Sequence, residues 1–365
     1  MKVLIDTYPL LIRSAGVKNY LFHWVEALWR AAPQGAIGTV PGLGRAVLHH
    51  DRSAVSWWRT GAGLASLALS NYAGVPLLDM AARRADIFHV SSLVRNPPRR
   101  PMLTATLHDL TAWTMPQLHL AANRKADAQL AANLRQAHRI IAVSEATRQD
   151  AIRILGIAPE KIVTIHSGVA SSFFSVAPEA VAQVRRRYRL KRQIILSVGT
   201  VEPRKNFGAL VNAYRALPAF LQDEYELVVA GPLGWADAET TQRVRTVRYL
   251  GYVPERDIAG LTAAATVFAY PSLYEGFGFP VAQAMAAGVP VVTSNVSALP
   301  EIAGDAALLV DPRSETELRD ALNRLLTYPD LRAKLAERGR ERAEQFRWEK
   351  CAAKSWQFFQ DAAGS

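Results

Sequence analysis

The glutamate Glu275 lies among glycines and aromatic residues in the stretch YEGFGFPVAQAMAAGVPVV. The apolar run TVFAYPS predicts a strand that ends just before Glu275 and brings it to the ligand-binding edge of a sheet. Gly276 and Gly278 allow backbone N–H groups to face a ligand. Pro280 suits the first turn of a helix, whose N-terminus favours anions. Gln283 follows one turn into that helix, on the side that we expect to face the ligand.

Two adjacent cations, Arg204 and Lys205, follow a second strand-like run, QIILSVG, in the segment TVEPRKNFGAL. Asn206 is the expected N-cap of the helix that comes next. Two cationic donors beside the positive end of a helix form a phosphate site. The alternative is a solvated pair of loop charges, but the position at a strand end favours phosphate binding.

Two residues of the first half could face the same ligand. His108 follows the run MLTATL, and its imidazole could donate a hydrogen bond to a sugar hydroxyl or a leaving group. A lone histidine is more often structural, so His108 alone decides little. Gly16 opens a helix in SAGVKNYLFHWVEAL, where the backbone can approach a phosphate. The turn is not a GxGxxG motif, so a dinucleotide site is disfavoured.

Short β-branched runs alternate with helix-like stretches along the whole chain, a pattern typical of parallel sheets buried on both faces. The sequence therefore predicts an α/β protein with two Rossmann-like, doubly wound domains, whose ligands bind beyond the carboxyl ends of the strands. The expected strands are at 2–5, 86–90, 102–108, 139–143 and 161–165 in the first half, and at 193–199, 225–231, 246–253, 266–271, 289–294 and 306–310 in the second.

A chain of 365 residues exceeds what one hydrophobic core usually serves, which also favours two domains. The expected division is a first domain over 1–170, a second domain over 171–345, and a helix over 346–365 that packs back toward the first domain. The first residues, MKVLIDTYPL, read as a strand and not as a signal peptide. The single cysteine, Cys351, suggests a reducing compartment, so we expect a cytoplasmic protein.

Basic residues concentrate in the first half. The net charge is +11, and residues 1–170 hold 19 Lys and Arg against 10 Asp and Glu, a net +9. Such an excess suits nucleic acid, anionic lipid or a phosphorylated substrate. The segments WWRTGAGLASLALSNYAGVPLL at 57 and RNPPRRP at 95 suggest docking on an anionic inner leaflet. The alternative, equally open here, is that Trp57 and Trp58 are core residues and the arginines are merely solvated.

Taken in order, these motifs resemble the retaining glycosyltransferases of family 4, which have the GT-B fold. That family carries E-G-F-G-[LF]-P followed by E-A-M-A-x-G-x-P-V-V, and this chain has EGFGFPVAQAMAAGVPVV. The family's GT-x-E-P-R-K-N appears here as GTVEPRKN. The glycine turn at Gly16, HDL at 108, AVSEATRQD at 142 and EKIVTIHSGV at 160 also match. The resemblance covers nearly the whole chain and implies an acceptor-side domain over 1–170 and a nucleotide-sugar-binding domain over 171–345, which face a central cleft.

The resemblance assigns a role to each matching residue. It implies that Arg204 and Lys205 hold the diphosphate of a nucleotide-sugar, and that Glu275 contacts the transferred sugar near its reacting face. The remaining assignments are sugar hydroxyls for the backbone of Gly276, Phe277 and Gly278, the diphosphate for Gly16, the sugar for His108 and the donor ribose for Gln283. The family has a second acid at the last position. Glutamine still pairs with hydroxyls but loses charge assistance, about 1 kcal/mol of donor binding.

The expected activity is a retaining hexosyl transfer, from GDP-mannose by resemblance to bacterial O-antigen and exopolysaccharide mannosyltransferases, to a glycan or lipid-linked acceptor. Cations and helix dipoles replace a metal in this family, so we expect neither a metal nor a cofactor. Same-face attack is favoured over a covalent intermediate on Glu275. The alternatives are another GT-B enzyme, such as a phosphorylase or sugar-nucleotide epimerase, or a basic nucleic-acid-binding protein. The last lacks a recognition motif, so we expect no nucleic-acid partner.

Overall fold

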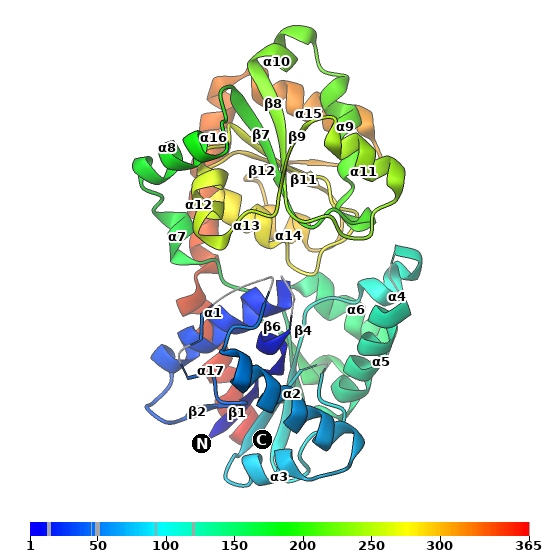
Figure 1. Ribbon diagram of the computed structural model, residues 1–365, viewed down its shortest axis with the longest axis vertical. Coiled ribbons are helices and arrows are strands. Elements are labelled where there is room, and N and C mark those ends of the chain that lie inside the picture. The colour runs from blue at the N-terminus through cyan, green and yellow to red at the C-terminus, as the bar shows by residue number, and fades with distance from the viewer. Residues whose placement is uncertain (13–15, 45, 48–51, 92, 119–120, 365) are drawn as a thin grey trace. The chain divides into compact units, whose positions relative to one another are not determined.

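The computed structural model describes residues 1–12, 16–44, 46–47, 52–91, 93–118 and 121–364, with the backbone alone for 121–127. The chain forms two compact units (Figure 1). Unit 1 comprises Met1–Gly168 together with Trp348–Ser365, and unit 2 comprises Val169–Arg347. The chain thus passes into unit 2 two residues before the expected boundary at 170, and returns to unit 1 at its last helix.

Unit 1 contains a six-stranded parallel sheet in the order β2-β1-β3-β4-β5-β6. Its strands are β1 Val3–Asp6, β2 Ile37–Val40, β3 Ile87–Val90, β4 Met102–Leu107, β5 Arg139–Ala142 and β6 Ile162–Thr164. The sequence pattern missed β2, because the short run IGTV contains a glycine and is followed at once by Pro41. Buried Leu4, Phe88, Leu103 and Ile140 form part of one core cluster under this sheet.

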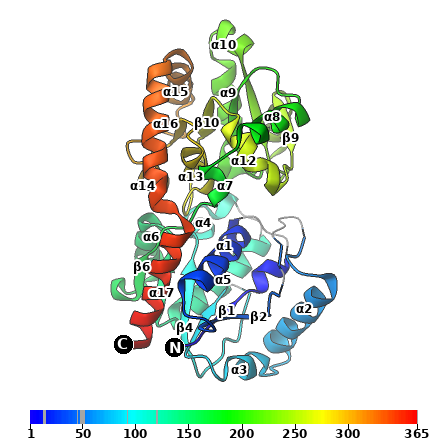
Figure 2. The same ribbon diagram turned by 90° about the vertical axis from the view of Figure 1, so that its left-hand side faces the viewer.

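The helices of unit 1 come from both ends of the chain. They are α1 Gly16–Ala31, α2 Trp57–Tyr72, α3 Leu77–Ala82, α4 Thr111–Thr114, α5 Ala121–Gln136, α6 Glu145–Leu155 and α17 Trp348–Gly364. Helix α17 packs along α1, as Figure 2 shows for the red C-terminal helix within unit 1. Nε1 of Trp24 on α1 donates to Oγ of Ser355 on α17 at 2.9 Å, and the Trp24 and Phe359 rings are 6.0 Å apart.

Unit 2 contains a second six-stranded parallel sheet, in the order β12-β11-β10-β7-β8-β9. Its strands are β7 Gln193–Val198, β8 Tyr225–Ala230, β9 Arg248–Gly251, β10 Val267–Tyr270, β11 Val291–Ser294 and β12 Ala307–Val310. All six lie within the expected runs, because continuous β-branched residues in strands buried on both faces leave a strong signal. Two doubly wound α/β units are therefore confirmed.

The helices of unit 2 flank this sheet (Figure 1). They are α7 Ser171–Phe174, α8 Pro178–Arg187, α9 Phe207–Arg215, α10 Ala219–Glu224, α11 Ala238–Arg245, α12 Glu255–Ala263, α13 Phe279–Ala286, α14 Leu299–Ala303, α15 Glu315–Thr327 and α16 Pro329–Ala343. Ser314 caps α15 by accepting from the backbone N–H of Glu317. One buried cluster joins the sheet to α9 and α15, and it includes Ile195, Val229, Leu210 and Leu322.

Candidate active site

The strand order of unit 2 reverses between β7 and β10, which are hydrogen-bonded neighbours. Numbered within the unit, the order is the Rossmann order 3-2-1-4-5-6, and ligands bind beyond the carboxyl ends of the two strands at this switch point. Arg204 and Lys205 follow β7, whereas Glu275 follows β10. The fold therefore brings Glu275 next to Arg204 and Lys205, although Lys205 and Glu275 are 70 positions apart in the chain. All three lie at the edge that doubly wound sheets use for ligands.

The segment after β7 is shaped by Pro203 and Asn206. Pro203 opens the 3₁₀ turn η4, Pro203–Lys205, and Asn206 adopts a left-handed conformation with φ of 58° before α9 begins. Asn206 occupies the expected N-cap position, but its side chain does not cap the helix. Its Nδ2 group donates instead to the carbonyl oxygens of Pro271 at 3.1 Å and Pro312 at 2.7 Å. These bonds tie the segment of the two cations to the segments that follow β10 and β12.

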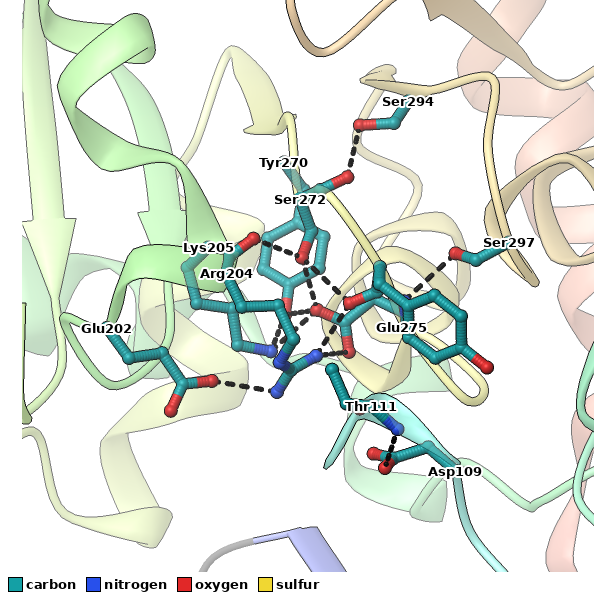
Figure 3. Close-up of polar contacts among 11 residues, drawn as sticks. Asp109, Thr111, Glu202, Arg204, Lys205, Tyr270, Ser272, Glu275, Ser294 and Ser297 are labelled. Carbon is teal, nitrogen blue, oxygen red and sulfur yellow. Dashed lines mark hydrogen bonds and ion pairs between the residues drawn. The ribbon is translucent and has the colours of Figure 1, made fainter. Parts of the chain in front are cut away.

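The carboxylate of Glu275 is buried and accepts several hydrogen bonds (Figure 3). Its Oε1 atom accepts from Nζ of Lys205 at 2.6 Å, from Oγ of Ser272 at 2.6 Å and from the hydroxyl of Tyr270 at 2.9 Å. Nζ of Lys205 also donates to the Tyr270 hydroxyl at 2.5 Å. Lys205 thus uses two of its three N–H donors within the described residues, and the third remains for a ligand.

Arg204 engages both acidic residues of the site. Its Nη1 atom lies 2.8 Å from Oε2 of Glu275 and donates to the carbonyl oxygen of Tyr274 at 2.7 Å. Its Nη2 atom donates to Oε1 of Glu202 at 2.7 Å. Glu202, Arg204, Lys205 and Glu275 are therefore a cluster in which two cations meet two carboxylates, and the guanidinium is fixed in orientation on both sides.

Burial and pairing act in opposite directions on these groups. Burial alone would raise the pKa of Glu275, but the charges of Arg204 and Lys205 and the hydrogen bonds from Lys205 and Ser272 lower this pKa to about 2. Burial and the charge of Arg204 lower the pKa of Lys205, while Glu275 and Glu202 oppose that shift. A carboxylate with so low a pKa and so many donors is a poor base and a poor nucleophile. Its contacts suit it to hold the two cations in place.

Two hydroxyl residues of this network were not predicted. Tyr270 is the last residue of β10, and burial, followed by the negative charge of Glu275, raises its pKa well above the usual value, so it is a neutral donor. Ser272 donates to Glu275, and its own carbonyl oxygen accepts from Oγ of Ser294 at 2.7 Å. Both residues lie near the end of the run TVFAYPS, just ahead of Glu275, and this position could have marked them as candidates. Spacing alone does not show which way their hydroxyl groups point.

The turn from Glu275 to α13 is built as the glycines predict. Gly278 has φ of 94° and precedes α13, and a Cβ atom there would lie 2.7 Å from Cδ2 of Leu299, so only glycine fits. Pro280 lies in the first turn of α13, as expected. The rings of Phe277 and Phe279 are 5.1 Å apart in a T-shaped arrangement. Gln283 is half-buried on α13 and makes no side-chain hydrogen bond with described residues.

The predicted residues of unit 1 lie at the carboxyl edge of its own sheet or beside it. His108 is half-buried directly after β4, with its ring 4.8 Å from that of Tyr20 on α1. Burial lowers the pKa of His108 to about 4, so the imidazole is neutral at pH 7. Gly16 is exposed at the first position of α1, with no atom within 4 Å of a Cβ built there.

Asp6 marks the switch point of unit 1, between the neighbouring strands β1 and β3. Its Oδ1 atom accepts from the backbone N–H of Tyr8 at 2.9 Å, and its Oδ2 atom accepts from the N–H and Oγ of Ser91 at 3.0 and 2.5 Å. Burial raises the pKa of Asp6 to about 6, although these hydrogen bonds oppose the shift. No pattern in the sequence predicted a role for Asp6 at a site.

The two tryptophans at the start of α2 are surface residues. Trp57 is 86% exposed and Trp58 is 56% exposed, so the interpretation of both as core residues is wrong. Among the described residues, no group of three or more His, Cys, Asp or Glu side chains is arranged to hold a metal ion. The same part of the chain contains no helix long and apolar enough to cross a bilayer.

Comparison with known proteins yields two family matches that together cover most of the chain. Residues 16–173 match the model described as Glycosyltransferase Family 4, and residues 182–342 match Glycosyl transferases group 1. The O-antigen chain mannosyltransferase B of Escherichia coli is 37% identical over 267 residues, which are 71% of this chain and 70% of that protein. The serotype-specific mannosyltransferase WbdA of E. coli is 29% identical over 227 residues, 60% of this chain but only 28% of that protein.

Solved structures share the fold of the chain over its full length. The structure of HepE from Anabaena in complex with UDP and glucose has a TM-score of 0.73 with 19% sequence identity, and the match covers 99% of this chain and 100% of that one. At this identity the likeness bears on the fold alone. This likeness in fold agrees with the two six-stranded parallel sheets described above.

Proposed function

This chain belongs to the family 4 glycosyltransferases, with the two-domain GT-B fold, and we propose that it transfers mannose from GDP-mannose with retention of configuration. The observation that carries the proposal is the buried cluster of Arg204, Lys205 and Glu275 at the switch point of unit 2. The mannosyl donor is supported by relatives named as mannosyltransferases. The acceptor is a glycan or a lipid-linked glycan of a cell-surface polysaccharide.

Arg204 and Lys205 would hold the diphosphate of the donor. Transfer of a sugar from a nucleoside diphosphate develops negative charge on the departing phosphate, and preorganised cations in a site that excludes water stabilise it most strongly. The paired geometry supports this role, because Glu202 and Glu275 fix both cations before any ligand arrives. The N-terminus of α13 adds a favourable dipole, and the backbone of Gly276, Phe277 and Gly278 would bind sugar hydroxyls.

The transfer itself needs no nucleophile from the protein. An acceptor hydroxyl oxygen attacks the anomeric carbon on the face from which the diphosphate departs. The bond between this carbon and the phosphate oxygen breaks, and the departing diphosphate takes the acceptor's proton. Glu275 then acts by positioning the two cations, which agrees with its low pKa and its hydrogen bonds to Lys205, Tyr270 and Ser272. Neutral His108 would donate a hydrogen bond to the sugar, and Gly16 would allow close approach to the diphosphate.

We propose that the reaction uses no metal and no cofactor, since the guanidinium and ammonium groups provide the positive charge. We also propose that the enzyme works in the cytoplasm at the inner face of a membrane, where a lipid-linked acceptor would be found. Gln283 would hold the donor ribose through its amide, with weaker binding than a carboxylate provides.

The donor proposal is tested by thermal shift with GDP, UDP and their nucleosides, followed by transfer assays in EDTA. We expect GDP to raise the melting temperature, GDP-mannose to support transfer in EDTA, and the product to keep the donor's anomeric configuration by NMR. A shift with UDP alone would reassign the donor base. Sugar release that requires inorganic phosphate would favour a phosphorylase, and formation of a new nucleotide-sugar without an acceptor would favour an epimerase.

A further inference from the structure

Helix α2 presents most of its apolar residues to solvent and its polar residues, apart from Tyr72, to the protein. The exposed positions of this 16-residue helix carry no charged side chain; they are Trp57, Trp58, Gly61, Ala62, Leu64, Ala65, Ala68, Leu69 and Tyr72. These nine residues are the outer face of α2. A surface helix of a soluble protein normally has the opposite arrangement, with polar residues outward. The sequence suggested that this segment docks on a membrane but could not show which of its residues are exposed.

The polar residues of α2 other than Tyr72 are half-buried or buried, and several of their side chains are hydrogen-bonded within unit 1. Oγ of Ser66 lies 2.8 Å from the hydroxyl of Tyr8, and Oγ1 of Thr60 donates to Oγ of Ser53 at 2.7 Å. Nδ2 of Asn71 donates to the carbonyl oxygen of Leu93 at 2.9 Å. Rotating α2 to hide its apolar face would break these bonds, so the outward orientation is fixed by the packing.

Aromatic and basic side chains meet at both ends of the outer face. The guanidinium carbon of Arg59 lies 5.2 Å from the ring centre of Trp58, and that of Arg95 lies 4.6 Å from the ring centre of Tyr72. Tryptophan and tyrosine concentrate where hydrocarbon meets polar headgroups, because each has an apolar body and a polar atom. The apolar centre of α2 is thus bracketed by residues suited to a membrane interface.

Five exposed arginines surround α3 and the end of α2 without an ion pair among the described residues; they are Arg83, Arg84, Arg95, Arg99 and Arg100. Their position follows from contacts with α3. The backbone N–H of Arg99 donates to Asp79 at 3.2 Å, and Arg100 donates to the carbonyl oxygen of Arg83 at 3.1 Å. Met80 on α3 is 64% exposed and continues the apolar surface. Basic residues around an apolar centre complement an anionic lipid surface.

We infer that the outer face of α2, with Met80 and the five arginines, docks on an anionic lipid bilayer. A helix of 16 residues is shorter than the roughly 20 residues that span a bilayer, so α2 would lie in the plane of the interface. A second copy of this chain is a poorer occupant, because association would bring the unpaired arginines of both copies together. The inference deepens the proposed membrane location but rests on the surface itself, and its test contains no sugar donor.

Co-sedimentation of the full chain with phosphatidylcholine vesicles, with or without phosphatidylglycerol, tests the inference. We expect binding to the anionic vesicles only, reduced at least tenfold between about 0.1 and 1 M NaCl, where the Debye length falls from about 10 to 3 Å. Leu64→Glu should lower the partition coefficient about tenfold or more, because the charge lies at the centre of the apolar face and is repelled by the lipid. Leu309→Glu in unit 2 is the matched control, since Leu64 and Leu309 are both 38% exposed.

Loss of binding in Leu64→Glu but not in Leu309→Glu supports the docking surface, provided that both variants keep the wild-type circular dichroism spectrum. Equal binding by wild type and Leu64→Glu would overturn it, as would the absence of any binding to anionic vesicles. A dimer in sedimentation equilibrium that Leu64→Glu dissociates, without vesicle binding, would assign the face to a second copy instead. If vesicles bind but no nucleoside diphosphate does, the proposed donor chemistry fails while the docking surface stands.

Discussion

The ligand edges of the two sheets treat buried charge in opposite ways. In unit 2, Glu275 is buried with two cations, and its pKa is lowered to about 2. In unit 1, Asp6 is buried without a cationic partner among the described residues, and its pKa is raised to about 6; burial also lowers the pKa of His108 to about 4. Burial disfavours the ionised form of Asp6, His108 and Glu275 alike, and only for Glu275 do ion pairs outweigh this effect. Unit 2 therefore keeps two cations for an anionic ligand, whereas His108 in unit 1 is neutral at pH 7 and can contribute only hydrogen bonds.

This difference fits the division of labour proposed for the enzyme. A diphosphate is stabilised best by cations that are already in position when it binds. Glu202 and Glu275 hold Arg204 and Lys205 in this way. An acceptor hydroxyl or the hydroxyls of the transferred sugar need only hydrogen bonds, which the neutral imidazole of His108 can supply. Four variants test this difference between the two units, and they follow in order of expected effect.

Lys205→Ala should have the largest effect, a fall in turnover of about 100- to 1,000-fold, because it removes a fixed cation from the departing diphosphate. Single-turnover rates with radiolabelled donor would measure it. Lys191→Ala is the matched control, since Lys191 is an exposed lysine just ahead of β7. Turnover of Lys205→Ala within threefold of that control would remove Lys205 from the chemistry.

Glu275→Gln should lower the free energy of unfolding by about 3 kcal/mol at pH 7, because it leaves the buried ammonium group of Lys205 without its carboxylate partner and leaves Arg204 paired with Glu202 alone. The pKa of Glu275 is lowered on folding, from 4.5 to about 2, so its stabilisation is complete above pH 4.5 and is lost as the pH falls toward 2. The stability gap between wild type and variant should then shrink by about 1 kcal/mol per pH unit below pH 4.5. Urea unfolding at pH 7, 4.5 and 3.5 measures the stability difference and its change with pH. A difference that does not depend on pH would contradict the pairing of Glu275 with Arg204 and Lys205.

Asp6→Asn should show the opposite pH dependence at a similar or smaller magnitude. The pKa of Asp6 is raised on folding, from 3.8 to about 6, so its contribution to stability is full below pH 3.8 and is lost as the pH rises through about 6. Between pH 4 and 7, the free energy of unfolding of the wild type should therefore fall by about 2 to 3 kcal/mol relative to that of Asp6→Asn. The same urea series measures this change. If the wild type instead became more stable relative to the variant over that range, Asp6 would have to be paired with a cation.

Gln283→Glu should have the smallest effect, donor binding that is unchanged or up to about fivefold tighter, because a carboxylate adds roughly 1 kcal/mol of charge assistance to a ribose hydroxyl. Calorimetric titration with GDP gives the dissociation constant, and the same titration with Gln242→Glu on α11 controls for added charge. Complete loss of GDP binding would mean that the amide N–H group of Gln283 has a donor role.

The sequence predicted unit 2 better than unit 1 for a physical reason. Strands buried on both faces leave continuous apolar runs, and the strand ends then locate Arg204, Lys205 and Glu275. The pattern could not show that Tyr270 and Ser272 point at Glu275, since hydrogen-bond direction depends on the packed loop. In unit 1, β2 does not stand out because its run IGTV contains a glycine and precedes Pro41, and the orientation of α2 depends on inward hydrogen bonds such as that from Asn71.

The central claim is that Arg204 and Lys205 recognise the diphosphate of the donor. Calorimetric titration of GDP and of guanosine into wild type and Lys205→Ala isolates this contribution, because the two ligands differ only in the diphosphate. We expect wild type to bind GDP at least about 100-fold more tightly than guanosine, and this ratio to fall about tenfold or more in Lys205→Ala, with guanosine binding unchanged. An equal ratio in the two proteins would contradict the claim, since the diphosphate would then be held elsewhere.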